Sequence, residues 1–172
     1  DLLFLTVADE DVLASWSIAD SSNMILTGYL GTRFEPENIY AYVNSSFLDT
    51  SAQIIYTIDS NNGYFAATDV SSAYSFNDMV LLDSVFGNLY KGHMDVDLSE
   101  SVAYSMGYST SSLYSSKSLN SIDISNPSGL SIISSFTGVE FSGKNYSDFV
   151  IDDIEKVGYI SINSNSDFSS AS

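Results

Sequence analysis

The sequence predicts an all-β fold, a β-propeller-like array of four-stranded antiparallel sheets with about three repeats of roughly 52 residues. The main observation is a strand-turn-strand phrase that recurs along the 172 residues and closes at Gly31, Gly87 and Gly138. Its copies read SWSIADSSNMILTGYLG, ATDVSSAYSFNDMVLLDSVFG and SIDISNPSGLSIISSFTG. The second observation is that apolar residues alternate or form short β-branched runs, without a helical period. Strand-filled repeats of this length are typical of modular arrays in which each repeat is one small sheet.

Two independent sets of markers keep the same period. Ile18, Val70 and Ile124 share one place in the phrase, and an aromatic residue marks the preceding apolar run of each unit, at Phe4, Tyr56, Tyr104 and Tyr159. We therefore expect one repeat domain over residues 1–172, with a partial repeat at 1–31, repeats at 36–87 and 92–138, and a partial repeat at 145–172. Because propellers usually need about four blades to close, we expect a segment of a larger propeller, or a ring that another copy or chain completes.

The turns between the expected strands have recognisable chemistry. Asn62-Gly63 separates IIYTIDS from YFAATDV and predicts a tight hairpin with positive φ. Asn126-Pro127-Ser128-Gly129 separates SIDI from LSIISSF, where proline fixes φ and removes a ladder donor. The alternative fold is a β-sandwich, which also has short strands at regular spacing. The repetition of whole units in order favours the propeller-like array.

One unit resembles a known family. The segment from Leu119 to Gly138, with Ile-Asp-Ile-Ser-Asn-Pro before an apolar strand, resembles the LVIVD-type propeller repeats of bacterial and archaeal surface proteins. The second unit keeps Thr68-Asp69-Val70-Ser71, and the first has Ser17 where the aspartate would stand. The resemblance implies a β-propeller used for surface display or interaction, and it carries over no catalytic residue.

Charge and composition exclude several function classes. The formal net charge is −17, with 22 acidic and 5 basic residues. Nucleic acid binding requires clustered Lys and Arg, and an anionic membrane surface would repel this chain. The chain has no cysteine, and no apolar run is long enough for a membrane span. Abundant Ser, Asn, Asp, Tyr and Gly with few cations predict an extracellular or cell-surface protein.

Acidic clusters are the candidate metal sites. Calcium binds six to eight oxygen ligands, chiefly from carboxylates, carbonyls and water. The candidate ligands are Asp95, Asp97, Glu100, Asp148, Asp152 and Asp153. None of these stretches matches the D-x-[DN]-x-[DN]-G loop, so solvated acidic turns are the alternative. The run Asp59-Ser60-Asn61-Asn62-Gly63 also resembles a calcium loop or a sialidase Asp box, but a hairpin turn explains it more simply.

Two Asn-x-Ser sequons, at Asn44 and Asn145, predict glycosylation sites, and both are expected in turns.

His93 is the only histidine and could act with Asp95 and Asp97 in acid-base chemistry, although a surface residue in a turn is the simpler interpretation. Exposed aromatic residues could stack on sugars, whereas core packing is their usual role. The candidates are Tyr40, Tyr42, Tyr108 and Tyr114, and Trp16 is expected in the core.

The predicted function is an extracellular structural or adhesion module, such as a subunit of a surface assembly or filament. Its partners would be other protein chains or copies of itself, joined through strand edges. The alternatives are a lactonase- or glycosidase-like propeller enzyme and a calcium-stabilised glycan-binding module. No G-x-S-x-G elbow or other catalytic constellation is present in the sequence, so an enzyme is the less favoured interpretation.

Overall fold

Thirteen strands and one 3-10 turn make up the regular structure of the residues that the computed structural model describes. These residues are 2–7, 12–20, 22–31, 43–59, 62–75, 79–108, 117–138, 145–152 and 154–163. The strands form four antiparallel sheets, which confirms the predicted all-β, propeller-like fold class. Within the same residues, no helix is long and apolar enough to cross a membrane.

Each sheet is built from strands that follow one another in the chain. The first sheet contains β1 (Leu2–Val7), β2 (Val12–Ser17) and β3 (Ile25–Gly31). The second contains β4 (Val43–Asp49), β5 (Ile54–Asp59), β6 (Tyr64–Asp69) and β7 (Val80–Phe86), with the 3-10 turn (Ser71–Ser75) between its last two strands. The third contains β8 (Tyr90–Asp97), β9 (Val102–Tyr108), β10 (Lys117–Asp123) and β11 (Ser131–Gly138). The fourth contains β12 (Asn145–Asp152) and β13 (Val157–Asn163).

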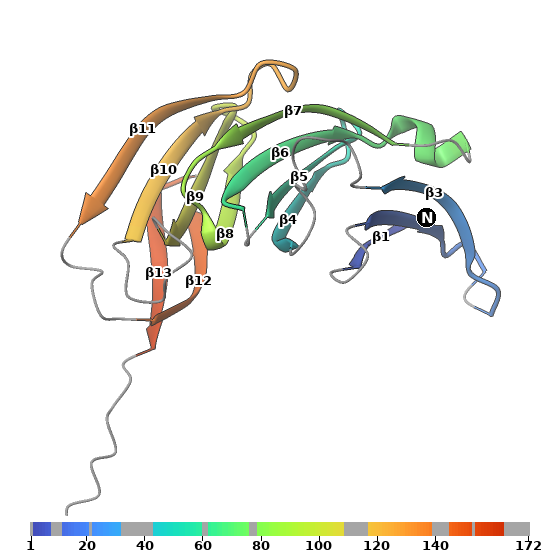
Figure 1. The fold of residues 1–172 in the computed structure, drawn as a ribbon, viewed down its shortest axis with the longest axis horizontal. Helices are drawn as coiled ribbons and strands as arrows, with labels where there is room; N and C mark the ends of the chain where they lie inside the picture. The colour runs from blue at the N-terminus through green and yellow to red at the C-terminus, as the bar shows by residue number, and fades with distance from the viewer. Residues whose placement is uncertain are drawn as a thin grey trace, which may run out of the picture.

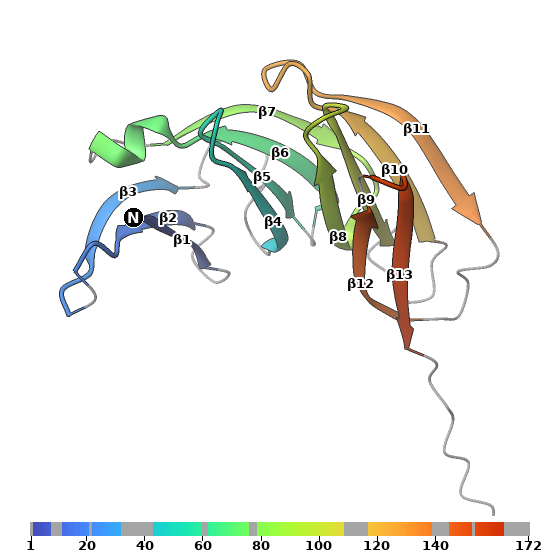
Figure 2. The same ribbon diagram turned by 180° about the vertical axis from the view of Figure 1, so that it is seen from behind.

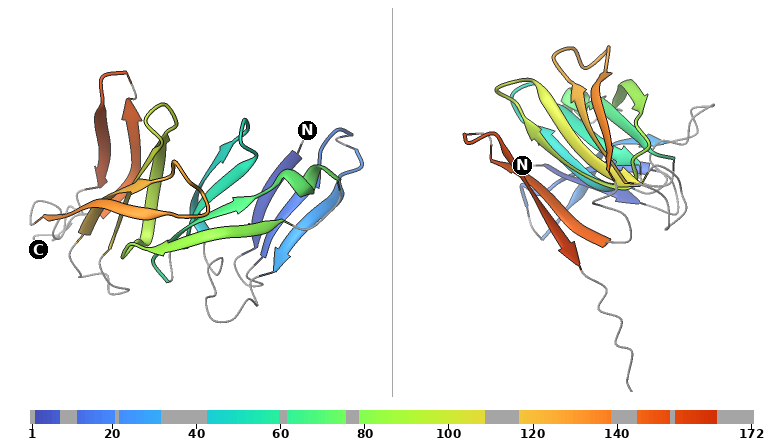
Figure 3. Two further views of the ribbon diagram at one scale, coloured as in Figure 1. Left: turned by 90° about the horizontal axis from the view of Figure 1, so that it is seen from above. Right: turned by 90° about the vertical axis from the view of Figure 1, so that its left-hand side faces the viewer.

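The sheets follow one another along a curved row (Figure 1). β7 and β11 lie on the convex side of this row, while β4 and β8 lie on the concave side, and the reverse view shows the same order (Figure 2). Seen from above, neighbouring sheets stand roughly face to face (Figure 3). We call the face that each sheet turns toward the next sheet in the chain its forward face, and the opposite one its back face.

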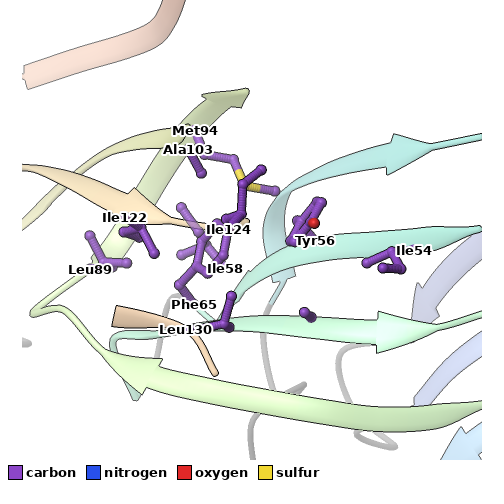
Figure 4. Packing of buried hydrophobic residues seen from close by; sticks show 11 residues of the cluster. Ile54, Tyr56, Ile58, Phe65, Leu89, Met94, Ala103, Ile122, Ile124 and Leu130 are labelled. Atoms are coloured by element: carbon purple, nitrogen blue, oxygen red, sulfur yellow. The ribbon is translucent and has the colours of Figure 1, made fainter. Parts of the chain in front are cut away.

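The core lies between consecutive sheets, not inside any one of them. One buried cluster joins the forward face of the second sheet to the back face of the third (Figure 4). It contains Ile54, Tyr56, Ile58, Phe65, Ala67, Leu89, Met94, Ala103, Ile122, Ile124 and Leu130. A second cluster, with Leu13, Ile55 and Ala66, joins the first sheet to the second. Strand β5 therefore buries both of its faces, which explains why IIYTI is a continuous apolar run.

An aspartate ends the first strand of the hairpin in three of the sheets. Asp49 Oδ1 accepts hydrogen bonds from Ser51 N (2.8 Å) and Ala52 N (3.0 Å). Asp97 and Asp152 make the corresponding contacts to the backbone of the turns that follow them. Each turn then closes with a non-glycine residue of positive φ, namely Gln53, Ser101 and Lys156. These side chains satisfy turn donors that the strand ladder leaves unpaired, so the sequence terminates each strand locally.

The short link between the second and third sheets, residues 87–89, contacts both of these sheets. Leu89 is fully buried, and its N–H and that of Gly87 both donate to the carbonyl of Gly63. Asn120 Nδ2 donates to the carbonyl of Gly87 at 3.0 Å. A Cβ on Gly107 would lie 2.6 Å from Leu89 Cα, so only glycine permits this close approach of two backbones.

Register shifts interrupt both outer pairings of the second and third sheets, the pairing of β2 with β3 and that of β12 with β13, whereas the pairing of β1 with β2 is regular. In the strands on the convex side, the residues skipped by the pairing are Thr27, Leu82 and Ile133, one in each complete phrase. Similar shifts occur where β4, β8 and β12 pair with their neighbours. The central pairings of β5 with β6 and of β9 with β10 are regular. Bulges of this kind disrupt the hydrogen-bonding edge that another strand would need.

Candidate interaction surface

The exposure of one repeated tyrosine position depends on the sheet that covers it. Tyr56, Tyr104 and Tyr159 each follow the strand-ending aspartate of their hairpin at the same distance in sequence. Tyr56 meets the complete third sheet and is 2% exposed, with its ring stacked on Phe65 at 5.7 Å. Tyr104 meets the two-stranded fourth sheet and is half-buried. Tyr159, on the forward face of the fourth sheet, is 56% exposed.

The exposed tyrosine belongs to an apolar face. Val150 lies directly opposite Tyr159 in the ladder, and Val157 is two residues from Tyr159 on the same strand, so all three share one face. Val150 is 52% and Val157 43% exposed. We call these three residues the Tyr159 face. Single exposed apolar residues are normal on proteins, but adjacent ones on one sheet face indicate an interaction site.

The back face of the first sheet is the second exposed apolar surface. Leu3 pairs with Trp16, and Trp16 pairs with Leu26, so these side chains lie side by side. Leu3 is 38% and Leu26 46% exposed, while Trp16 is half-buried. We call these residues the Trp16 face. The prediction that Trp16 lies in the core is therefore only partly met, because none of the buried clusters includes it.

A cavity of about 230 Å³ lies between the third and fourth sheets. Its lining combines apolar side chains with one ion pair: Asp97, Tyr104, Leu119, Phe149, Ile151, Lys156, Gly158 and Ile160. Gly158 occupies the position that Ile55 has in the second sheet, counted from the strand-ending aspartate. Ile55 packs into the interface with the first sheet, whereas a Cβ on Gly158 would lie 3.1 Å from the ring of Phe149, which occupies the adjoining space.

The ion pair in this wall joins the third sheet to the fourth. Lys156 Nζ donates to Asp97 Oδ2 at 2.5 Å and lies 3.7 Å from Glu100 Oε1. The hydrogen bond from Lys156, followed by that from Ser99, lowers the pKa of Asp97 to about 2. Asp97 is almost fully buried, and its second oxygen accepts the turn N–H groups. Its carboxylate therefore stays ionised and fixes the relative position of two sheets.

The structure separates the predicted calcium ligands into different contacts. Asp95 accepts hydrogen bonds from Val96 N (2.9 Å) and Ile151 N (2.7 Å), which links β8 to β12. Asp97 and Asp152 cap turns, and Glu100 is exposed beside Lys156. Among the described residues, no three acidic or histidine side chains come together as a metal site. The side chain of Asp148 and the whole of Asp153 lie outside the described residues, so calcium binding stays a prediction.

The turn at Asn62-Gly63 has the predicted geometry. Gly63 has φ 75°, and its N–H donates to the carbonyl of Asp59 at 2.9 Å. Asp59 is 1% exposed, and its carboxylate accepts from both the backbone and the side chain of Asn62. These hydrogen bonds support the hairpin interpretation of this run.

Both sequons differ from their expected setting. Asn44 and Asn145 were expected in turns, but Asn44 lies in β4, at the residue that the pairing with β5 skips, and Asn145 is the first residue of β12. β12 begins before its apolar run, at Asn145, and in β4 the polar residues 44–46 continue a strand that begins at Val43. Glycosylation at these residues stays a prediction.

His93 also lies in a strand, β8, and not in a turn. It is opposite Met106 and half-buried.

Of the candidate sugar-stacking residues, Tyr108 is buried and its ring lies 5.0 Å from Lys117 Nζ, so it packs in the interior. Burial raises the pKa of Tyr108 and lowers that of Lys117. Tyr40, Tyr42 and Tyr114 lie outside the described residues.

Solved structures resemble the fold closely, although no family model and no curated protein matches the chain. A protein from Lactobacillus plantarum aligns with a TM-score of 0.69 and 12% identity, over 94% of this chain and 47% of its own. A protein from Bacteroides fragilis, proposed to be a 6-phosphogluconolactonase, aligns with a TM-score of 0.53 and 11% identity, over 92% of this chain and 46% of its own. This chain therefore spans about half the length of these structures, and the likeness shows the fold alone.

Proposed function

We propose that this chain is a structural and interaction module that binds protein partners by stacking sheets, with the Tyr159 face as its docking surface. The observation that carries the proposal is the exposure of one repeated position, 2% at Tyr56 and 56% at Tyr159. The first is covered by a following sheet of four strands. A partner sheet over the fourth sheet would give Tyr159 the environment that its equivalent already has.

The internal interfaces indicate what such a partner must present. The forward face of the second sheet meets aliphatic side chains of the third, including Met94, Ala103 and Ile122. Polar contacts then fix the sheets at their rims, as Asp83 Oδ2 does by accepting from Leu130 N at 2.8 Å. A partner of the Tyr159 face would therefore be a β-sheet with an aliphatic face and a donor for its rim.

Sheet faces serve this role better than strand edges. The strands at both edges of the second and third sheets carry register shifts, so their hydrogen-bonding edges are interrupted. Interrupted edges are a common protection against unwanted strand pairing. Stacking uses side chains instead and requires no free ladder positions.

An extracellular or surface location is part of this proposal. It is supported by the −17 net charge and the low number of basic residues, both of which favour solubility and disfavour anionic surfaces as partners. The sequons and the LVIVD-type resemblance agree with such a location. The enzyme and calcium-dependent glycan-binding alternatives stay predictions, without a contact among the described residues that favours either.

The proposal is tested by the substitution Tyr159→Asp with a neutral apolar dye such as Nile red. Wild-type protein, at a concentration and salt at which it is monomeric, should bind the dye. The variant should bind less, with the remainder on the Trp16 face, while its stability changes by only about 0.5 kcal/mol, as expected for a surface site. Ile133→Asp is the matched control, because Ile133 is 58% exposed on β11, away from the Tyr159 face. A loss of several kcal/mol in Tyr159→Asp, or unchanged dye binding, would contradict the proposal.

A further inference from the structure

We infer that the partner of the Tyr159 face is a second copy of this chain, which docks with its Trp16 face, so that two copies close a ring through two identical contacts. This inference rests on the proposed function, because it identifies the partner of the same docking surface. It adds a second surface, at the other end of the row of sheets, and a definite stoichiometry.

The Trp16 face and the Tyr159 face correspond to the two sides of the interfaces between consecutive sheets. Among the described residues, the buried clusters and the cavity lining join the forward face of one sheet to the back face of the next. In the first sheet, Phe4 and Leu13 point toward the second sheet, and Trp16 is on the opposite side. The Trp16 face is thus a back face and the Tyr159 face a forward face, and each has an aromatic residue flanked by exposed aliphatic ones. Aromatic side chains often form the energetic centre of an interface.

The geometry of the row favours closure by two copies. The sheets follow a curve, and the Trp16 and Tyr159 faces belong to the sheets at its two ends (Figures 1 and 2). The chain aligns with 47% and 46% of two structures of the same fold. Two copies would therefore supply about as many residues as either of these structures contains. A head-to-tail contact forms a ring when its rotation closes and an open filament when it does not.

Charge decides which surfaces of two copies can meet. Each copy has a net charge of −17, so most contacts between copies bring carboxylates together. The side chains that define the two faces are uncharged: Leu3, Trp16, Leu26, Val150, Val157 and Tyr159. By register, Asp148 and Asp152 also belong to the Tyr159 side of the fourth sheet, and Asp152, at the end of its strand, accepts turn N–H groups. Association through the two faces should strengthen with added salt, because salt screens the general repulsion without weakening apolar burial. A contact built on ion pairs would weaken under the same change.

The test is the mass of the full chain in solution, measured by sedimentation equilibrium or light scattering at low and at 0.5 M (about 4 Å screening length) salt. We expect a species of twice the 18.7 kDa chain mass whose fraction rises with salt. Leu26→Asp and Tyr159→Asp should each give monomers, whereas Ile133→Asp, which adds the same charge at an exposed apolar residue, should leave the dimer unchanged. Thermal unfolding of each variant confirms that it is folded.

Mixing the two disrupting variants gives the decisive result. In a mixed pair, one contact joins the intact Tyr159 face to the intact Trp16 face, so the mixture should associate although neither variant does so alone. Absence of this rescue, a monomer at every concentration and salt, or growth beyond two copies would overturn the inference. If Tyr159→Asp loses dye binding while the wild-type chain is monomeric, only the inference fails; if dye binding is also unaffected, the proposed function fails with it.

Discussion

The repeated tyrosine position allows one substitution to be compared in two environments. Tyr56→Ala removes a ring that is 2% exposed and stacked on Phe65, within the cluster between the second and third sheets. Truncating a buried aromatic residue costs about 3–5 kcal/mol, from lost burial and from the cavity that remains. Tyr159→Ala removes a ring that is 56% exposed, so its cost should stay below about 1 kcal/mol.

Urea unfolding followed by circular dichroism measures both changes. With a slope of about 2 kcal/mol per molar urea, a loss of about 4 kcal/mol moves the midpoint by about 2 M, and Tyr159→Ala should move it by less than about 0.5 M. The comparison should be made at low protein concentration, so that self-association does not stabilise the wild type. Equal shifts for the two variants would refute the reasoning that Tyr159 lacks the covering sheet that Tyr56 has.

Three further predictions concern the contacts between and within sheets. The stabilisation from ionised Asp97, whose pKa is held near 2 chiefly by Lys156, is complete above the ordinary pKa of 3.8 and is lost as pH falls toward about 2. Lys156→Met should therefore flatten the acid part of a stability-versus-pH curve, and an unchanged curve would contradict the role of this ion pair. Gly107→Ala should lower the free energy of unfolding by about 1–3 kcal/mol, because the new Cβ meets the backbone of Leu89, whereas Gly129→Ala meets a movable Asn126 side chain and should cost less. A chelator such as EDTA should leave the thermal midpoint unchanged, since Asp95, Asp97 and Asp152 already accept backbone or lysine donors; a fall of several degrees would instead support the calcium prediction.

The sequence carried enough information for the fold class, because local chemistry sets the strand ends. Asp49, Asp97 and Asp152 each terminate a strand by accepting from the next turn, and these contacts span only two or three residues. Gly63 adopts the positive φ that its turn requires. The strand-ending aspartate recurs in three of the four sheets, so the period is visible without any knowledge of packing.

The candidate site was less accessible to sequence reasoning, because it depends on which sheet faces meet. An aspartate at a strand end looks the same in the sequence whether it caps a turn, pairs with Lys156 or binds a metal. The contact of Asp97 with Lys156 crosses from one sheet to the next and cannot be inferred from spacing alone. The exposure of Tyr159 was also hidden, since the aromatic pattern treats it as equivalent to Tyr56.

Interrupted edge strands limit how such a protein can change in size. An insertion that widened one sheet would have to pair across an interrupted ladder, as at Ile133 in β11. Duplication of a whole unit meets no such obstacle, because each unit carries its own turns and its own two apolar faces. We therefore expect growth by whole units along the curve, with each added unit turning the curve further.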